Sequence, residues 1–252
     1  MGRFQDVLHN EIEGIDTLPL LHTCDAYFLR PILETRKLLP KSCGIFNEEL
    51  LYAYYGLPSY RSNYSKSTLN PAYYPCCFIL NPTELGELYK MFPLDSGAFE
   101  SIPEIKEMFF HRNSKIIDFE IEAKMENAKK IIKTFYGTNE QYISQQPNKN
   151  VLFSALDFEA NGYHNLINYR GGSIADDRAS SIEIIFNKEI NLDNSSVFQV
   201  IIPKCFKDDI RIMNLLKDNL GIEEPLSYDT HRGNPKEYFG LIRSEYLKFL
   251  EK

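Results

Sequence analysis

Short runs of β-branched and aromatic residues lie on both sides of a helical middle, and this order constrains the fold more than any other feature of the sequence. Such runs, bounded by Gly, Pro or Asn, are typical of short strands. Between residues 100 and 150 apolar residues recur at helical spacing instead, as at Ile121, Met125 and Ala128. We therefore predict a mixed α+β protein. The predicted strands are residues 18–24, 51–55, 74–80, 151–156, 181–186 and 197–202.

The helical middle and the C-terminal end carry clear helix signals. The segment 118–136 begins with glutamates and ends with lysines before Gly137, an order that complements the helix dipole and suits a C-terminal cap. Asn234 and Pro235 predict the start of the last helix. The chain has 252 residues, no repeat and no clear linker. We expect a single domain over 1–252, a helical insertion at 100–150, C-terminal helices at 204–252 packed on the core, and a hairpin formed by strands 181–186 and 197–202.

Charge and cysteine content limit the function and the compartment. The net charge of −7 argues against a broadly basic nucleic-acid surface, although a local basic groove is still allowed. Five cysteines without a Cys-x-x-Cys pair suit reduced thiols, and no run approaches the roughly 18 apolar residues of a membrane span. The five histidines are far apart in the sequence, so no metal site is predicted. We expect a cytoplasmic protein that neither associates with a membrane nor holds a metal ion.

Glu183 is the residue with the most unusual surroundings, because it lies in the apolar run 181–186. An ionised carboxylate is costly to bury without a partner. Glu183 therefore either faces solvent on an edge strand, which is the commoner case, or lies in a cleft where its charge is used. The preceding loop contains a Gly pair and the polar candidates Arg170, Ser173 and Arg178. Arg178 is also a candidate for a structural ion pair.

Two earlier stretches supply further candidate site residues. His22 and Thr23 end a short apolar strand, where a histidine either bonds to backbone or points into a cleft with its neighbour. Tyr54 and Tyr55 are candidates for the core, the rim of a pocket or a ligand platform. Arg61 follows a Pro-Ser-Tyr loop, where a guanidinium either pairs with phosphate or stays solvated.

Taken in order, these pieces resemble the ADP-ribosyltransferase fold, and most closely its bacterial branch of DarT-type toxins. His22-Thr23 and the following Ile32-Leu33 and Leu38-Leu39-Pro40 are similar to the opening of that family, with Lys37 where glycine is common. The tyrosine-rich strand 51–55 is similar to the second family element, and Glu183 occupies the position of the catalytic glutamate. The resemblance implies a split mixed or antiparallel β-core, and it covers about 18–80 and 165–203.

The resemblance also implies an activity and a set of roles. It predicts an NAD-consuming ADP-ribosyltransferase or NAD glycohydrolase, as in a bacterial toxin or an anti-phage defence effector, with NAD as substrate. Glu183 would be catalytic. The predicted NAD-binding residues are His22, Thr23, Tyr54, Tyr55 and Arg61, and the predicted acceptor-binding residues are Arg170, Ser173 and Arg178.

The acceptor and the partners are left open by the sequence. The acceptor is a nucleic acid or a protein, and an antitoxin or a defence partner is a further possibility. A second class of function fits the same residues: a non-enzymatic sensor or protein-binding module that keeps the fold without turnover.

Overall fold

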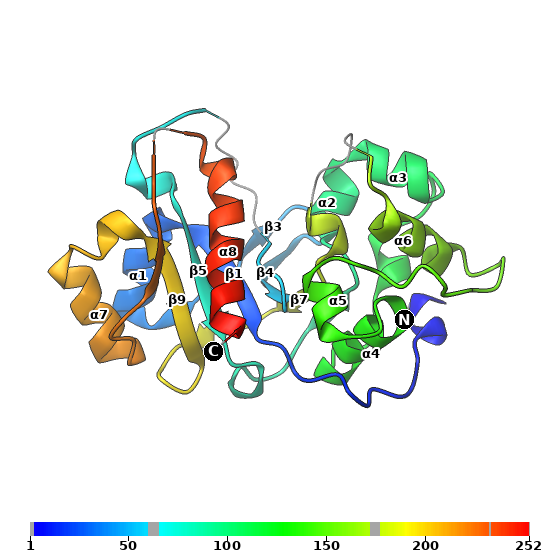
Figure 1. Cartoon of the computed structure of the whole chain (residues 1–252), viewed down its shortest axis with the longest axis horizontal. Coiled ribbons are helices and arrows are strands. Elements are labelled where there is room, and N and C mark those ends of the chain that lie inside the picture. The colour runs from blue at the N-terminus through cyan, green and yellow to red at the C-terminus, as the bar shows by residue number, and fades with distance from the viewer. Residues whose placement is uncertain (1–2, 60–65, 172–176, 232, 252) are drawn as a thin grey trace. The chain divides into compact units, whose positions relative to one another are not determined.

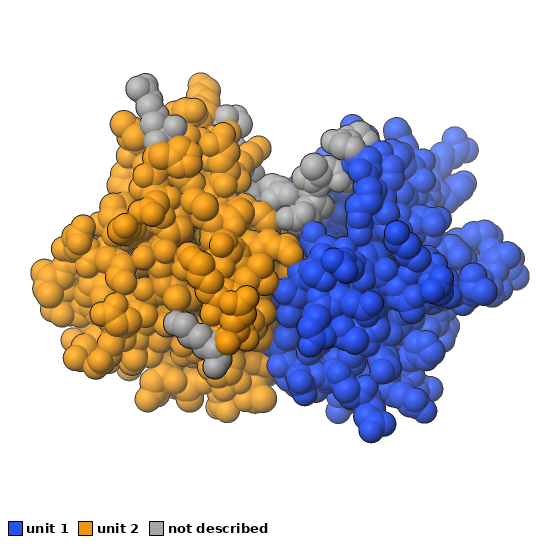
Figure 2. Space-filling model, in the orientation of Figure 1, with its two compact units in different colours: residues 1–18, 42–56, 88–187 blue, residues 19–41, 57–87, 188–252 orange. Residues whose placement is uncertain are grey.

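The computed structural model describes residues 3–59, 66–171, 177–231 and 233–251. The chain forms two compact units, coloured separately in Figure 2. Unit 1 comprises Met1–Leu18, Ser42–Gly56 and Leu88–Asn187, and unit 2 comprises Pro19–Lys41, Leu57–Glu87 and Lys188–Lys252. Neither unit is a continuous segment. Both contain strands and helices, so the α+β class predicted from the sequence is confirmed.

Unit 1 is built on three antiparallel strands. The central strand is β7 (Glu183–Phe186), with β4 (Glu48–Tyr55) on one side and β6 (Lys90–Phe92) on the other. The short β3 (Lys41–Cys43) pairs with β4. Both edges of β7 are paired with strands of unit 1, so the predicted hairpin between 181–186 and 197–202 is wrong. A central strand also explains why all four residues of β7 are buried.

Helices of unit 1 come mainly from the predicted helical middle (Figure 1). Two of them, α3 (Pro103–Phe109) and α5 (Asn139–Ile143), lie within the predicted helical range 100–150. The helix predicted over 118–136 is shorter, because its first residues form a 3-10 turn and Ile121 bonds to the backbone of Met91. The remaining helices of the unit are α2 (Ser96–Ser101), α4 (Met125–Phe135) and α6 (Phe158–Asn168).

The strand predicted at 151–156 is wrong. These residues are irregular, and Leu152 and Leu156 are 93% and 71% exposed. The segment forms a turn that leads into α6, in which the Ser154 N–H donates to Asp157 Oδ2 at 3.0 Å and the Asp157 N–H donates to the Ser154 carbonyl at 3.0 Å. A short apolar run favours a strand by local pattern, but here it precedes a helix that the same pattern does not reveal.

Gly162 allows α6 to approach the end of α3. A Cβ at this position would lie 2.5 Å from the Phe109 carbonyl oxygen and 2.5 Å from the Phe110 ring, so one of them would have to move. We expect Gly162→Ala to lower the free energy of unfolding by about 1–3 kcal/mol, the usual cost of overpacking. Urea denaturation would measure it. Gly240→Ala is the matched control, because a Cβ at position 240 would meet nothing within 4 Å. Gly240 lies in α8, and alanine stabilises a helix relative to glycine. Equal effects of the two substitutions would contradict the prediction.

Unit 2 contains a mixed sheet in the order β10-β9-β5-β1. The strands β1 (Leu20–Asp25), β5 (Pro75–Leu80) and β9 (Val197–Pro203) pair antiparallel, and β10 (Leu226–Tyr228) lies parallel to β9. The predicted strands 18–24, 74–80 and 197–202 are thus confirmed with small shifts of boundary. All of β5 is buried, which matches its continuous apolar run.

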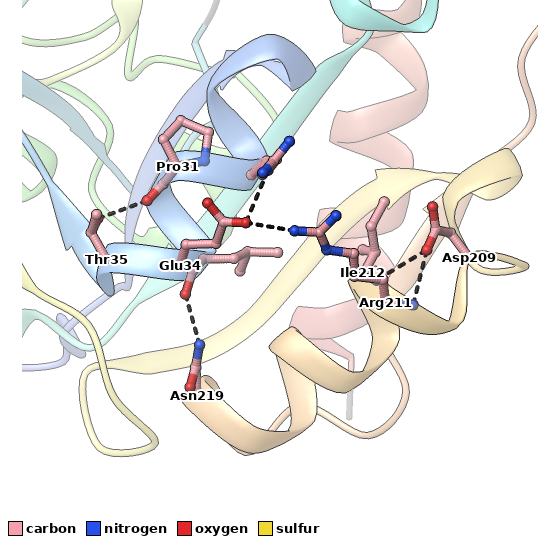
Figure 3. A network of polar contacts seen from close by, with 9 residues as sticks. Pro31, Glu34, Thr35, Asp209, Arg211, Ile212 and Asn219 are labelled. Atoms are coloured by element: carbon pink, nitrogen blue, oxygen red, sulfur yellow. Dashed lines mark hydrogen bonds and ion pairs between the residues drawn. The ribbon is translucent and has the colours of Figure 1, made fainter.

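Helices in the described part of the chain complete unit 2. From α8 (Phe239–Leu250), Ile242 and Tyr246 pack into one core with Leu21, Ile79 and Ile201 of the sheet. α7 (Ile210–Leu220) packs on α1 (Leu29–Thr35), where Asn219 Nδ2 donates to the Leu33 carbonyl at 2.8 Å (Figure 3). In the same network Glu34 accepts hydrogen bonds from Arg30 and Arg211. A short pair, β2 (Lys37–Leu38) with β8 (Ile190–Asn191), follows α1.

Candidate functional site

The sheet that β4, β7 and β6 form in unit 1 has one polar face and one apolar face. Glu183 lies directly opposite Tyr54 on β4 and Phe92 on β6, so the three side chains share a face. Ile184 lies opposite Ala53, and both side chains point to the other face of the sheet, as does Tyr55. All three residues are 0–1% exposed. The alternation of side chains along a strand therefore separates Glu183 from its apolar neighbours in the sequence.

Glu183 does not face solvent on an edge strand, which was the commoner expectation from sequence. It lies on the central strand and is only 1% exposed. Its Oε2 accepts a hydrogen bond from the Ser96 N–H at 3.2 Å. The solvent-facing alternative is therefore wrong, and Glu183 is a carboxylate enclosed among polar groups.

Asp95 is the residue that sequence reasoning missed. It is 4% exposed, it is close enough to Glu183 for their charges to interact, and its Oδ2 accepts a hydrogen bond from the Tyr54 hydroxyl at 2.5 Å. Its other oxygen accepts from the Ala98 N–H and caps α2. An aspartate followed by Ser-Gly is a usable cap signal, but nothing in the sequence shows that this cap is buried beside Glu183.

Burial and the neighbouring carboxylate control the protonation of Glu183. Burial raises the pKa of Glu183 well above its usual 4.5, and the charge of Asp95 raises it further. Hydrogen bonds from Ser96 act in the opposite direction and are outweighed. Two buried carboxylates in reach of each other resist double ionisation, so the pair holds a proton over a wider pH range than an exposed pair would.

Two tyrosines of β4 extend the polar face. Burial raises the pKa of Tyr54 strongly, and the negative charge of Asp95 adds to this effect, while Arg178 acts to lower the pKa. Tyr52, two residues earlier on the same face, donates to Cys43 Sγ at 2.8 Å. Both tyrosines are therefore neutral hydrogen-bond donors at physiological pH. The polar face comprises Cys43, Tyr52, Tyr54, Asp95, Ser96 and Glu183.

Tyr142 of α5 fixes the start of β7 against β4. Its hydroxyl donates to the Tyr55 carbonyl at 2.7 Å and accepts from the Ile182 N–H at 3.1 Å, one residue before Glu183. Tyr142 is fully buried. The helical middle therefore positions the catalytic candidate through this hydroxyl.

We expect Tyr142→Phe to destabilise the protein by about 1–3 kcal/mol, because a buried donor and a buried acceptor both lose their partner. Tyr89→Phe is the matched control, since the Tyr89 hydroxyl donates to the exposed Glu48 at 2.7 Å and not to buried backbone. Urea denaturation of both variants would measure the difference. A cost for Tyr142→Phe no larger than that for Tyr89→Phe would show that the hydroxyl does not clamp the strands.

The predicted arginines occupy different settings. Arg178 lies near Tyr54, and its carbonyl accepts the Asp95 N–H at 3.1 Å, so this segment borders the polar face. Arg170 instead directs its guanidinium to three backbone carbonyls, of Ile167, Tyr169 and Gln145, at 2.8–3.0 Å. Its geometry supports a structural role at the end of α6. Arg61 and Ser173 lie outside the described residues.

His22 and Thr23 lie on β1 of unit 2. His22 is opposite Phe78 and Thr23 is opposite Cys77. Because consecutive side chains on a strand alternate, His22 and Thr23 point to opposite faces of their sheet. Leu21, Cys77 and Ile79 pack in the core beneath α8, which places Thr23 on that face and His22 on the other. The two side chains therefore do not point into one cleft together.

Within the described ranges, no group of three or more His, Cys, Asp or Glu side chains is arranged to hold a metal ion. In the same part of the chain, no helix combines the length and apolar character needed to cross a membrane. No protein-family model and no curated protein sequence matches the chain.

Proposed function

We propose that the chain is an NAD-consuming ADP-ribosyltransferase in which Glu183 is the catalytic residue. The observation that carries the proposal is the position of Glu183: a buried carboxylate on the polar face of a central strand, opposite Tyr54 and bonded to the Ser96 N–H. Its agreement with the family position of the catalytic glutamate supports the same role. Antiparallel strand pairs, and helix α1 a few residues after the His22-Thr23 strand, are also compatible with the family fold.

The reaction makes a specific demand on such a carboxylate. The bond between nicotinamide and ribose breaks, its electron pair leaves with nicotinamide, and the ribose carbon becomes oxocarbenium-like before the acceptor attacks. An ionised Glu183 would stabilise this positive charge and would accept the proton of the acceptor. The positive nicotinamide ring of NAD favours that ionised form, because an opposite charge nearby lowers a carboxyl pKa. The raised pKa of free Glu183 therefore suits a residue that ionises when its substrate binds.

The other candidate residues receive roles by their settings. Tyr54 shares the face of Glu183, so the proposal assigns the nicotinamide contact to Tyr54 rather than to Tyr55, whose hydroxyl accepts the Leu18 N–H on the core face. For His22 and Thr23, which belong to unit 2, the predicted NAD contact rests on the family resemblance. Arg178 is a better candidate than Arg170 for the acceptor.

A non-enzymatic binding module is the second candidate, and one observation favours it. Glu183 and Asp95 are almost completely buried, which is also the setting of a structural carboxylate pair. The two candidates differ in turnover. Incubation with labelled NAD and a cell lysate should release nicotinamide and transfer label if the first is correct. Absence of both, with a stable partner in pull-downs that Glu183→Gln does not disturb, would establish the second.

A further inference from the structure

A cavity of about 650 Å³ lies in unit 1 between the end of α3, residues 110–118 and the first turns of α6. This volume is within the range of small-ligand sites, about 300–1,000 Å³. None of its lining residues belongs to β4, β6 or β7 or to the polar face around Glu183. The cavity is therefore a separate candidate site, and its role does not depend on the proposed enzyme activity.

Three phenylalanine rings line the cavity. Phe110 is half-buried and is held by ring contacts to Phe99 at 5.5 Å and Phe119 at 4.9 Å. Phe109 is likewise fixed by an edge contact to Tyr169 at 5.3 Å. Phe158 is 63% exposed, although an aromatic side chain of this size is usually covered. The cavity therefore has two fixed rings and one ring open to solvent.

The acidic side chains of the cavity are hydrogen-bond acceptors. Asp118 and Glu159 supply carboxylates, and Asp118 uses one oxygen to accept the Lys115 N–H at 2.8 Å. Asn161 donates its amide to the carbonyls of Ser154 and Asp157, so its oxygen is the group left for a ligand.

Basic groups are scarce around these acceptors. Among the lining residues that the structure describes there is no Lys or Arg, and His111 is the one titratable base. Arg112 and Lys115 of the same connection are exposed and do not line the cavity. The lining is therefore complementary to a cation.

Two exposed leucines lie in the segment that contributes Ala155 to the cavity. In the sequence, Leu156 lies between the lining residues Ala155 and Phe158, and Leu152 is in the same irregular segment. Both leucines are strongly exposed. Aromatic faces attract cations, and carboxylates bind guanidinium or ammonium groups through charge-assisted hydrogen bonds. Exposed apolar side chains in the same segment suit the alkyl stem that carries the charge.

We infer that this cavity binds a guanidinium or ammonium group carried on an alkyl chain. The charge contacts Glu159 and Asp118, the ring faces of Phe109 and Phe158 cover it, and the stem lies along Leu156. An anionic ligand would meet two carboxylates without a lining Lys or Arg. The same cation is available from an Arg or Lys side chain of a protein partner and from a free polyamine or guanidine.

Calorimetric titration of the full chain would test the inference with three probes: agmatine, spermidine, and a short peptide with one arginine between leucines. The citrulline version of the peptide keeps its shape without the charge. We expect Glu159→Gln to weaken binding of the cationic probes about tenfold or more, and Phe158→Ala to weaken it as well. Glu107→Gln, on the exposed surface of α3 outside the cavity lining, is the control variant and should leave binding unchanged.

Each outcome decides the inference. Preference for the arginine peptide over agmatine identifies a protein partner as the source, and the reverse identifies a free amine; both support the site. Equal binding of the arginine and citrulline peptides, equal weakening by Glu159→Gln and Glu107→Gln, or no binding of any cation at millimolar concentration would overturn it. Preferential binding of a single-stranded oligonucleotide would overturn it too. None of these measurements uses NAD, so failure here is distinct from failure of the proposed activity.

Discussion

Glu183→Gln should release nicotinamide from NAD about 10²- to 10³-fold more slowly than the wild-type chain. The amide keeps the size of the side chain and can still accept the Ser96 N–H. It cannot supply the negative charge that stabilises an oxocarbenium-like transition state, nor can it accept a proton. The measurement is the rate of nicotinamide release at saturating NAD, because loss of the charge acts on the chemical step rather than on binding alone.

Two variants make this test specific. Glu49→Gln removes a carboxylate from an exposed position of β4 and should leave the rate unchanged. His22→Ala should raise the KM for NAD more than it lowers kcat if His22 binds NAD. An unchanged rate in Glu183→Gln, measured in a preparation that does release nicotinamide, would remove Glu183 from the catalytic role.

The same substitution should make the protein more stable at neutral pH. The folded-state pKa of Glu183 is above its unfolded value of about 4.5. Between the two values the folded state binds the extra proton, so stability falls as the pH rises above about 4.5, and the loss is complete above the folded-state pKa. Glutamine does not titrate, so Glu183→Gln lacks this loss. We expect a gain of about 1–4 kcal/mol at pH 8, the range seen when buried charges are replaced by neutral groups.

Urea denaturation from pH 4 to pH 8 would measure this effect. The difference between Glu183→Gln and wild type should be small near pH 4, where both states of the wild type are protonated, and should grow with pH. Asp95→Asn should reduce the pH dependence, because it removes the second cause of the raised pKa. Exposed Glu49→Gln should show a flat difference. A difference that does not change with pH would mean that Glu183 titrates like an exposed carboxyl. This test is independent of NAD.

Strand and helix identity was readable from the sequence wherever the local pattern and the tertiary surroundings agree. β5 has a continuous apolar run and is buried throughout. The cap Asn234 with Pro235 occurs as predicted, at the turn that leads into α8. The segment Val151–Leu156 shows the opposite case. Its residues are mostly apolar, but no strand pairs with it and Ser154 instead bonds to Asp157. A strand needs a partner, and a partner is not a local property.

Strand pairing was the second feature beyond the reach of local reasoning. The runs 181–186 and 197–202 are neighbours in sequence, so a hairpin was the simplest expectation. In the structure β7 pairs with β4 and β6, and β9 pairs with β5 and β10. The order of the strands in a sheet depends on which apolar faces are buried against each other within each unit. The residues that form these faces are far apart in the sequence.

By itself, the sequence determined that the protein is α+β, that Glu183 is out of place in an apolar run, and that a tyrosine-rich strand lies earlier in the chain. These are properties of composition and spacing. Only the tertiary structure decided that Glu183 is buried rather than exposed, that Tyr54 and not Tyr55 shares its face, and that Asp95 lies within reach of its charge. The physical reason is that burial and pKa depend on groups brought together from β4, β7 and the start of α2, and no local pattern encodes their proximity.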